Sequence, residues 1–122
     1  SFSPDGKHVL TAEGWTAGKV QKGQAVLWDC SSGDLKIRYA GHRGHVTAIA
    51  FSADGRYVAT GSTDCSAILW DARTAKALHT FSGHRGAVNS VAFSPNAGHL
   101  ATGSSDQTVR IWLLPERQKP RK

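Results

Sequence analysis

Short runs rich in apolar and β-branched residues alternate with turn-type residues along the chain. Runs of this length, bounded by Asp, Asn, Gly and Pro, predict strands. Two successive copies of the pattern comprise Val46–Phe51, Tyr57–Gly61 and Ala67–Trp70, and then Val88–Phe93, His99–Gly103 and Thr108–Trp112. The runs begin about ten residues apart and none has helical periodicity, so the sequence predicts an all-β fold.

A fourth strand is predicted after a further turn in two copies, at Leu35–Tyr39 and at Ala77–Phe81. In the first of these, Lys36 and Arg38 alternate with apolar residues, whereas the first three strands of each copy are more continuously apolar. Continuous apolar runs suit sheets that are covered on both faces. Alternating positive charge suits an edge strand, because it discourages pairing with a further strand.

The pattern repeats with a fixed period. Trp28, Trp70 and Trp112 are evenly spaced, and the same interval separates the Gly-His pairs at 41–42 and 83–84. This interval is here called the repeat period. Repetition of this kind is the sequence signature of a repeat architecture, in which each copy is one structural unit.

One copy is longer than the others. Phe2, Phe51 and Phe93 each open a turn segment of the type Phe-Ser-x-(Asp/Asn). The interval from Phe51 to Phe93 equals the repeat period, whereas the interval from Phe2 to Phe51 is longer. The first copy therefore contains seven extra residues, and the simplest place for them is between Thr11 and Trp28.

The repeat resembles the WD-repeat β-propeller family. The elements that carry the resemblance are Gly-His, the Phe-Ser-x-Asp-Gly turn, ATGSTD at 59–64 and the Leu-Trp-Asp or Ile-Trp ends of the third strands, in order over residues 1–114. The resemblance implies four-stranded antiparallel blades, about two and a half of them in this chain. Propellers have about four to eight blades, so the chain is expected to be the C-terminal part of a larger propeller.

The predicted domain organisation follows the repeat. Residues 1–41 are expected to form a partial blade with an inserted loop at 13–23, and residues 42–83 a full blade. Residues 84–114 are expected to form a last blade that lacks its outer strand, followed by a basic tail at 115–122. The open sheet edges of the chain are expected to contact the remaining blades of the parent propeller or other copies of the chain.

The same resemblance implies a buried hydrogen-bond network in each blade, in which a tryptophan meets a threonine, the threonine a histidine, and an aspartate completes the chain. The residues at these positions are His42, Thr60, Asp64 and Trp70, then His84, Thr102, Asp106 and Trp112, and in the first copy Thr11 and Trp28. A satisfied buried network fixes the geometry of its sheet. In the first copy Lys22 occupies the aspartate position, so a partial network is expected there.

A hydrolase of the Ser-His-Asp type would need similar residues, but a catalytic triad occurs once per site and not once per repeat. The segment 14–20 differs from a phosphate-binding loop in its glycine spacing and in the residue after its lysine. Cys30 and Cys65 form no CxxC pair, and no paired Cys/His spacing recurs. We therefore expect no enzyme activity, no cofactor and no metal site, and a reduced intracellular compartment, cytoplasmic or nuclear.

The resemblance also implies that partners dock on one rim, formed by the loops that join the fourth strand to the next first strand and the second strand to the third. The positions chosen there as partner-binding are His45, Thr47, Thr63, Asn89 and Ser105. These side chains are small or polar, and a plain solvent-facing role is the alternative. Loop residues on a rigid scaffold are favoured binding positions.

The insertion at 13–23 falls in the same type of loop. Trp15 is predicted to contact a partner, because tryptophan is enriched at interface hot spots. Lys19 and Lys22 would favour an acidic partner. Packing of Trp15 onto a neighbouring blade is an equally weighted alternative.

Composition supports a globular protein, with 39% hydrophobic and 20% charged residues among 122. No run approaches the roughly 18–20 apolar residues of a membrane helix, so no membrane association is expected. The net charge is +6, of which the tail 115–122 supplies +3. The expected function is therefore a non-catalytic protein-interaction scaffold in a multi-subunit assembly. The alternatives are nucleic-acid or nucleoprotein binding through the tail and rim, and a regulatory domain of a larger enzyme.

Overall fold

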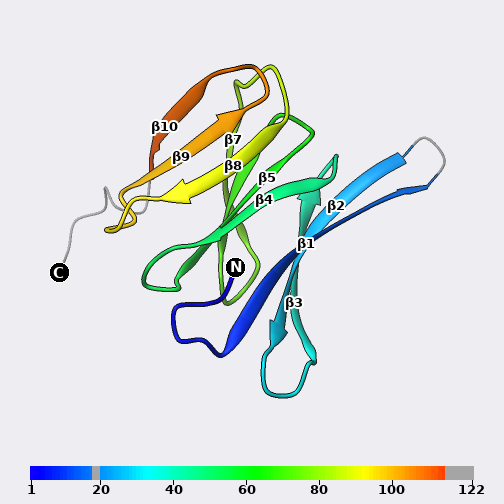
Figure 1. The fold of residues 1–122 in the computed structure, drawn as a ribbon, viewed down its shortest axis with the longest axis vertical. Helices are drawn as coiled ribbons and strands as arrows, with labels where there is room; N and C mark the ends of the chain where they lie inside the picture. The colour runs from blue at the N-terminus through cyan, green and yellow to red at the C-terminus, as the bar shows by residue number, and fades with distance from the viewer. Residues whose placement is uncertain (18–19, 115–122) are drawn as a thin grey trace.

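A computed structural model describes residues 1–17 and 20–114, and all regular structure in these ranges is β-strand (Figure 1). The strands are β1 His8–Ala17, β2 Val20–Asp29, β3 Leu35–His42, β4 Val46–Phe51, β5 Tyr57–Ser62, β6 Ala67–Asp71, β7 Ala77–Phe81, β8 Val88–Phe93, β9 His99–Ser104 and β10 Val109–Leu113. The all-β prediction is confirmed. No helix in the described ranges is long and apolar enough to cross a membrane.

The strands form three antiparallel sheets, ordered β1-β2-β3, β4-β5-β6-β7 and β10-β9-β8, here called the first, second and third sheets. Only the second sheet has four strands among the described residues. The first lacks a counterpart of β4 and has there only a single bridge between Phe2 and Val9. In the part of the chain that the structure describes, which ends at residue 114, the third sheet has no counterpart of β7. The division at 1–41, 42–83 and 84–114 remains a prediction.

Each pair of consecutive sheets encloses an apolar core. Between the first and second sheets, Leu10, Leu27, Tyr39 and Trp70 are at most 7% exposed, and the rings of Tyr39 and Trp70 meet edge to face with centroids 5.8 Å apart. The second and third sheets enclose a separate core of buried residues, which comprises Tyr57, Ala59, Ala67, Leu69, Phe81, Ala97, Leu100 and Leu114. β5 is buried along its whole length because both faces of the second sheet are covered.

Hydrogen bonds also join consecutive sheets. The buried Tyr39 hydroxyl donates to the Ala72 carbonyl at 2.6 Å, from β3 of the first sheet to the second sheet. Burial raises the pKa of Tyr39 to about 12, so it stays a protonated donor at neutral pH. The Thr47 hydroxyl donates across the next junction to the Val88 carbonyl.

The predicted loop at 13–23 is wrong, because most of this segment is strand. The pairing of β1 with β2 continues without interruption from His8↔Asp29 to Ala17↔Val20. The insertion therefore lengthens a hairpin, whose far end stands clear of β4–β10 in Figure 1. Antiparallel pairing accounts for this outcome, because it satisfies backbone N–H and C=O groups that a loop would leave to water.

The base of this hairpin packs closely against the second sheet. A Cβ atom on Gly23 would lie 2.5 Å from the Gly44 carbonyl oxygen and 2.5 Å from the Val46 amide nitrogen. Gly23 also pairs with His42, and the β2–β3 pairing is irregular between Gly23 and Gln24. Glycine is required here because the backbone of the β3–β4 loop occupies the space of a side chain.

Several strand boundaries differ slightly from the prediction, and β5, β6 and β9 each end one residue later than expected. β3 extends to His42 instead of ending at Tyr39, and β10 covers Val109–Leu113 instead of 108–112. On β10 the side chains of Val109, Ile111 and Leu113 are 70%, 65% and 53% exposed. The outer face of the third sheet is therefore apolar and uncovered among the described residues.

Candidate functional site

A chain of four hydrogen-bonded side chains, here called the relay, joins the end of β3 in the first sheet to the second sheet. The Trp70 indole Nε1–H donates to Thr60 Oγ1 at 2.9 Å, and Thr60 Oγ1 lies 2.7 Å from His42 Nε2. His42 Nδ1 lies 3.0 Å from Asp64 Oδ2. β3, β5 and β6 supply the first three side chains, and the turn after β5 supplies Asp64.

The donors and acceptors fix one direction for the relay. An indole nitrogen can only donate, so Thr60 Oγ1 accepts from Trp70 and its own hydrogen is free to donate to His42 Nε2. Nδ1 of the neutral imidazole then carries the hydrogen that is donated to Asp64. With this tautomer Thr60 Oγ1 accepts one hydrogen bond and donates another, and both ring nitrogens of His42 have a partner.

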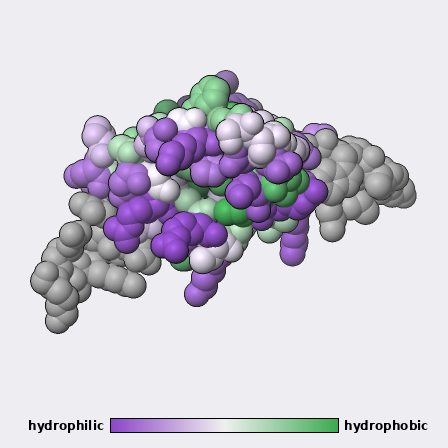
Figure 2. Space-filling view, turned by 90° about the horizontal axis from the view of Figure 1, so that it is seen from below, coloured by the Kyte–Doolittle hydropathy of each residue, from purple (hydrophilic) through white to green (hydrophobic). Residues whose placement is uncertain are grey.

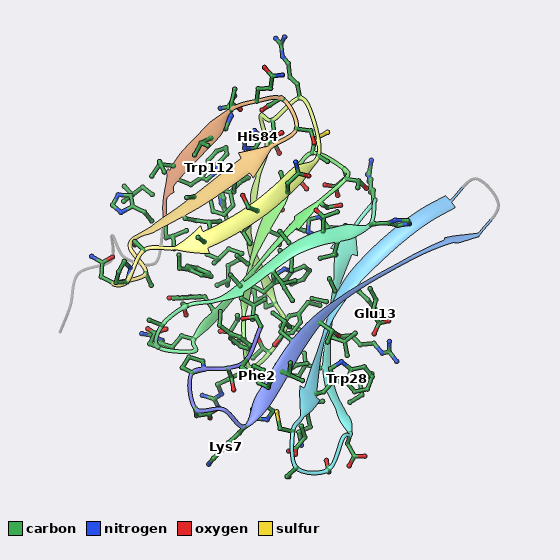
Figure 3. All side chains as sticks on the ribbon, viewed as in Figure 1. Phe2, Lys7, Glu13, Trp28, His84 and Trp112 are labelled. Carbon is green, nitrogen blue, oxygen red and sulfur yellow. The ribbon has the colours of Figure 1, made fainter. Side chains whose placement is uncertain are left out.

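The third sheet repeats the relay with nearly the same distances. Trp112 Nε1 donates to Thr102 Oγ1 at 3.0 Å, which lies 2.7 Å from His84 Nε2, and His84 Nδ1 lies 3.1 Å from Asp106 Oδ2. Figure 3 labels His84 and Trp112 on this sheet. The indole of Trp112 also packs against Phe81, with centroids 5.0 Å apart.

The carboxylates that end the relays are held in the ionised form. Burial raises the pKa of Asp64, but hydrogen bonds from Ser66, His42 and the Arg43 amide outweigh it, so the pKa lies below its ordinary value. The hydrogen bond from Thr108 and that from the Arg85 amide lower the pKa of Asp106 strongly. Each carboxylate therefore accepts hydrogen bonds as an anion near neutral pH.

The relay has the connectivity of a hydrolase triad, but its hydroxyl group cannot reach a substrate. Thr60 is 0% exposed and Thr102 1% exposed, and each accepts a hydrogen bond from an indole. A nucleophile must lie within reach of the bond that it attacks. These six threonine, histidine and aspartate side chains therefore have a geometry suited to holding the sheets together.

The first sheet contains only part of the relay. Trp28 Nε1 donates to Thr11 Oγ1 at 2.9 Å. The side chain of Lys22, which occupies the aspartate position, lies outside the described residues.

The expected rim positions gather where β5 and β9 end. The His45 amide donates to Thr63 Oγ1 at 3.0 Å, and the Thr63 amide donates back to the His45 carbonyl. The Asn89 side chain donates to Ser105 Oγ at 2.9 Å, and both residues are exposed. The fifth residue, Thr47, uses its hydroxyl in the contact between sheets described above.

The three positions predicted in the insertion are less fully placed. Trp15 lies on β1 and Lys22 lies directly opposite on β2, but their side chains are outside the described residues. Lys19 lies outside them altogether.

Sequence reasoning missed one member of each relay. Ser66 and Thr108 donate their hydroxyl groups to Asp64 Oδ1 and Asp106 Oδ1. A signal was available, because both residues stand four positions before the relay tryptophan and both carry a hydroxyl group.

Residues 1–17 and 20–114 contain no group of three or more His, Cys, Asp or Glu side chains that could hold a metal ion. Cys30 and Cys65 are both free thiols, the first of them exposed.

Comparisons with known proteins match the repeat. The family model described as "WD domain, G-beta repeat" matches residues 33–71 and 75–112, which is more than half of the chain. No curated protein sequence matches the chain. Among solved structures, the chain is similar to "Crystal structure of RRP9 WD40 repeats" and to "Structure of U3-55K", each with a TM-score of 0.81 and 30% sequence identity.

Both structural matches cover 95% of this chain. They cover only 34% and 35% of the matched chains, so this chain spans about a third of their length.

Proposed function

Because the chain belongs to the WD40 repeat family, we propose that it acts as a non-catalytic scaffold for protein–protein contacts in a multi-subunit assembly. Domains of this family generally serve as interaction scaffolds and typically bind other proteins. The proposal includes an intracellular location, cytoplasmic or nuclear.

The observation that carries this proposal is the long β1–β2 hairpin. Its pairing extends to Ala17↔Val20, whereas β3 pairs with β2 only as far as Gly23. An isolated two-stranded ribbon is only marginally stable in water. A ribbon that leaves its sheet beside the rim loop at 43–46 is well placed to contact a partner protein.

The proposal also assigns partners to the open faces. The uncovered Val109, Ile111 and Leu113 form an apolar stripe, and exposed apolar faces of this kind generally mark contact surfaces. We assign this stripe to a further blade of a larger propeller, or to another copy of the chain. The match to about a third of each structural relative supports the first of these.

The experiment is affinity purification of the complete protein, with bound proteins identified by mass spectrometry. The test variant combines Trp15→Ala with Lys22→Glu, and the matched control carries Lys7→Glu at the opposite end of β1. Figure 3 labels Lys7 at that end and Glu13 near the base of the hairpin. We expect the test variant to lose at least one partner while it keeps its melting temperature.

Two results would contradict the proposal. Retention of every partner by the test variant would exclude the hairpin as a contact. Salt-sensitive binding of RNA or DNA that depends on the tail 115–122, without any protein partner, would favour the nucleic-acid alternative.

A further inference from the structure

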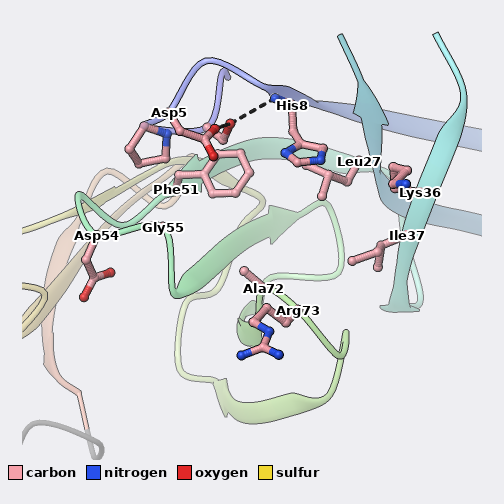
Figure 4. Close-up of a pocket in the computed structure, with 12 residues that line it drawn as sticks. Asp5, His8, Leu27, Lys36, Ile37, Phe51, Asp54, Gly55, Ala72 and Arg73 are labelled. Atoms are coloured by element: carbon pink, nitrogen blue, oxygen red, sulfur yellow. Dashed lines mark hydrogen bonds between the residues drawn. The ribbon is translucent and has the colours of Figure 1, made fainter. Parts of the chain in front are cut away.

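A groove of about 500 Å³ lies between the first and second sheets, at the end opposite the rim (Figure 4). Asp54 and Gly55, which precede β5, line it, whereas the rim residue Thr63 follows β5. Its apolar floor is formed by Leu27, Ile37 and Phe51. A volume between about 300 and 1,000 Å³ is typical of ligand pockets.

The repeat supplies an internal comparison that shows why this groove is open. At the junction of the second and third sheets, Leu114 stands one repeat period after Ala72, and Ala97 stands one period after Gly55. Leu114 and Ala97 are 1% and 3% exposed and belong to the core there. The first junction has the smaller residue at both positions, so its floor is left accessible.

A third equivalent position shows a change in the same direction. Tyr57 belongs to the second core, whereas its counterpart at the start of β1 is His8, which lines the groove. Similarly, Leu78 packs against the second core, whereas its counterpart one period earlier is Lys36. One junction is therefore closed by its own apolar side chains, and the other offers a half-buried floor with polar edges.

The acidic side chains at the edges of the groove accept hydrogen bonds from nearby groups, whereas the basic side chains have no acidic partner that the structure describes. Asp5 Oδ1 accepts hydrogen bonds from Ser3 Oγ and the Lys7 amide, so this carboxylate is used within its own turn. In the described ranges 1–17 and 20–114, the two groove cations, Lys36 and Arg73, have no carboxylate within 4.0 Å.

The other groove carboxylate is used in the same way. Asp54 Oδ1 accepts hydrogen bonds from Ser52 Oγ and the Arg56 amide. Both carboxylates stay ionised, so the formal charges of the lining balance, but among the described residues Lys36 and Arg73 are the charged groove side chains that make no hydrogen bond of their own.

We propose that this groove binds a short extended segment of a partner protein, which inserts one large apolar side chain over Phe51 and sets a carboxylate against Lys36 and Arg73. The floor supplies apolar area, and the two cations supply orientation through charge-assisted hydrogen bonds. The face of the molecule seen from below in Figure 2 is mostly hydrophilic with small hydrophobic patches. This site is separate from the rim and does not depend on the rim contacts.

The test measures binding of a fluorescent peptide with one phenylalanine between acidic residues to the complete protein. A second peptide carries a photo-crosslinking analogue of the phenylalanine, and mass spectrometry locates the crosslink. We expect saturable binding that a basic version of the peptide lacks, with crosslinks to the Ile37 and Phe51 segments.

Two variants separate the apolar and charged parts of the site. Ala72→Leu introduces the residue that closes the second junction, and it should weaken binding at least about tenfold, or about 1.4 kcal/mol. Lys36→Glu with Arg73→Glu should weaken binding by a similar factor. The matched control, Arg38→Glu with Lys76→Glu, makes the same charge change on the same strand and in the same turn, outside the groove.

The melting temperature of each variant shows whether it is folded, and the charge variants lie at exposed positions. The proposal is overturned if the peptide does not bind the unmodified protein at millimolar concentration. It is equally overturned if the control and test charge variants lose the same affinity, or if the crosslinks lie on the rim.

Discussion

Replacing Thr60 by valine is expected to remove the centre of the second-sheet relay while keeping the shape of the side chain. Thr60 Oγ1 accepts a hydrogen bond from Trp70 Nε1 and donates one to His42 Nε2, and Thr60 is 0% exposed. Valine has no hydroxyl group, so it can neither accept the hydrogen bond from Trp70 nor donate one to His42. A buried donor and a buried acceptor are then left unpaired.

The magnitude follows from the number of bonds lost. Leaving one buried polar group unsatisfied costs about 1–3 kcal/mol, so two groups predict about 2–6 kcal/mol for Thr60→Val. The first sheet provides a matched comparison, because among the described residues the Thr11 hydroxyl bonds only to Trp28, which is partly exposed. Thr11→Val should therefore cost about 1 kcal/mol.

Urea unfolding followed by far-ultraviolet circular dichroism measures both variants in the complete protein. The midpoint should fall further for Thr60→Val than for Thr11→Val, with the same m value for both. Equal losses for the two variants would refute the reasoning, because they would show that the His42 bond contributes nothing. A loss below about 0.5 kcal/mol for Thr60→Val would refute it as well.

Three further predictions concern other parts of the fold. Asp64 and Asp106 have lowered pKa values in the folded chain, so their contribution to stability is complete above about pH 5 and is lost as the pH falls below about 4. Acid unfolding curves of the variant with both residues replaced by Asn should therefore show a smaller pH dependence. Gly23→Ala should lower the melting temperature, at a cost of about 1–3 kcal/mol, because its Cβ would meet backbone atoms at 2.5 Å; an unchanged melting temperature would contradict this. Ile111→Glu with Leu113→Glu should reduce self-association of the 122-residue chain in sedimentation velocity, and a chain that is monomeric before substitution would exclude the predicted open face.

Most of the architecture could be predicted from the repeat spacing. The evenly spaced tryptophans predicted the strands because the chain repeats one structural unit, and the family model matches two of these units. The sequence also placed His42, Thr60 and Asp64 among the relay residues through the family resemblance. The hydrogen-bond direction could not be predicted, because it depends on which atoms face each other in space.

Two features were beyond the sequence pattern for physical reasons. Glycine-rich segments usually indicate turns, but Gly23 pairs with Gly14 and lets the hairpin continue past the backbone of the β3–β4 loop. The groove depends on the sizes of residues from two sheets, such as Ala72 and Phe51, and no local pattern reveals that an equivalent position is larger elsewhere. The repeat period gives the equivalent positions, but only the structure shows that they line the junctions between sheets.

The contact at Gly23 has a mechanical consequence. Gly23 is wedged against the backbone of Gly44 and Val46 and pairs with His42, which in turn is bonded to Thr60 beneath Trp70. A force applied to the far end of the hairpin would therefore be transmitted through the contact at Gly23. Because Gly23 pairs with His42, that force would displace the His42 imidazole. The fluorescence of Trp70, which shares a core with the sheet-bound part of the hairpin, would then respond to a load on the far end of that hairpin.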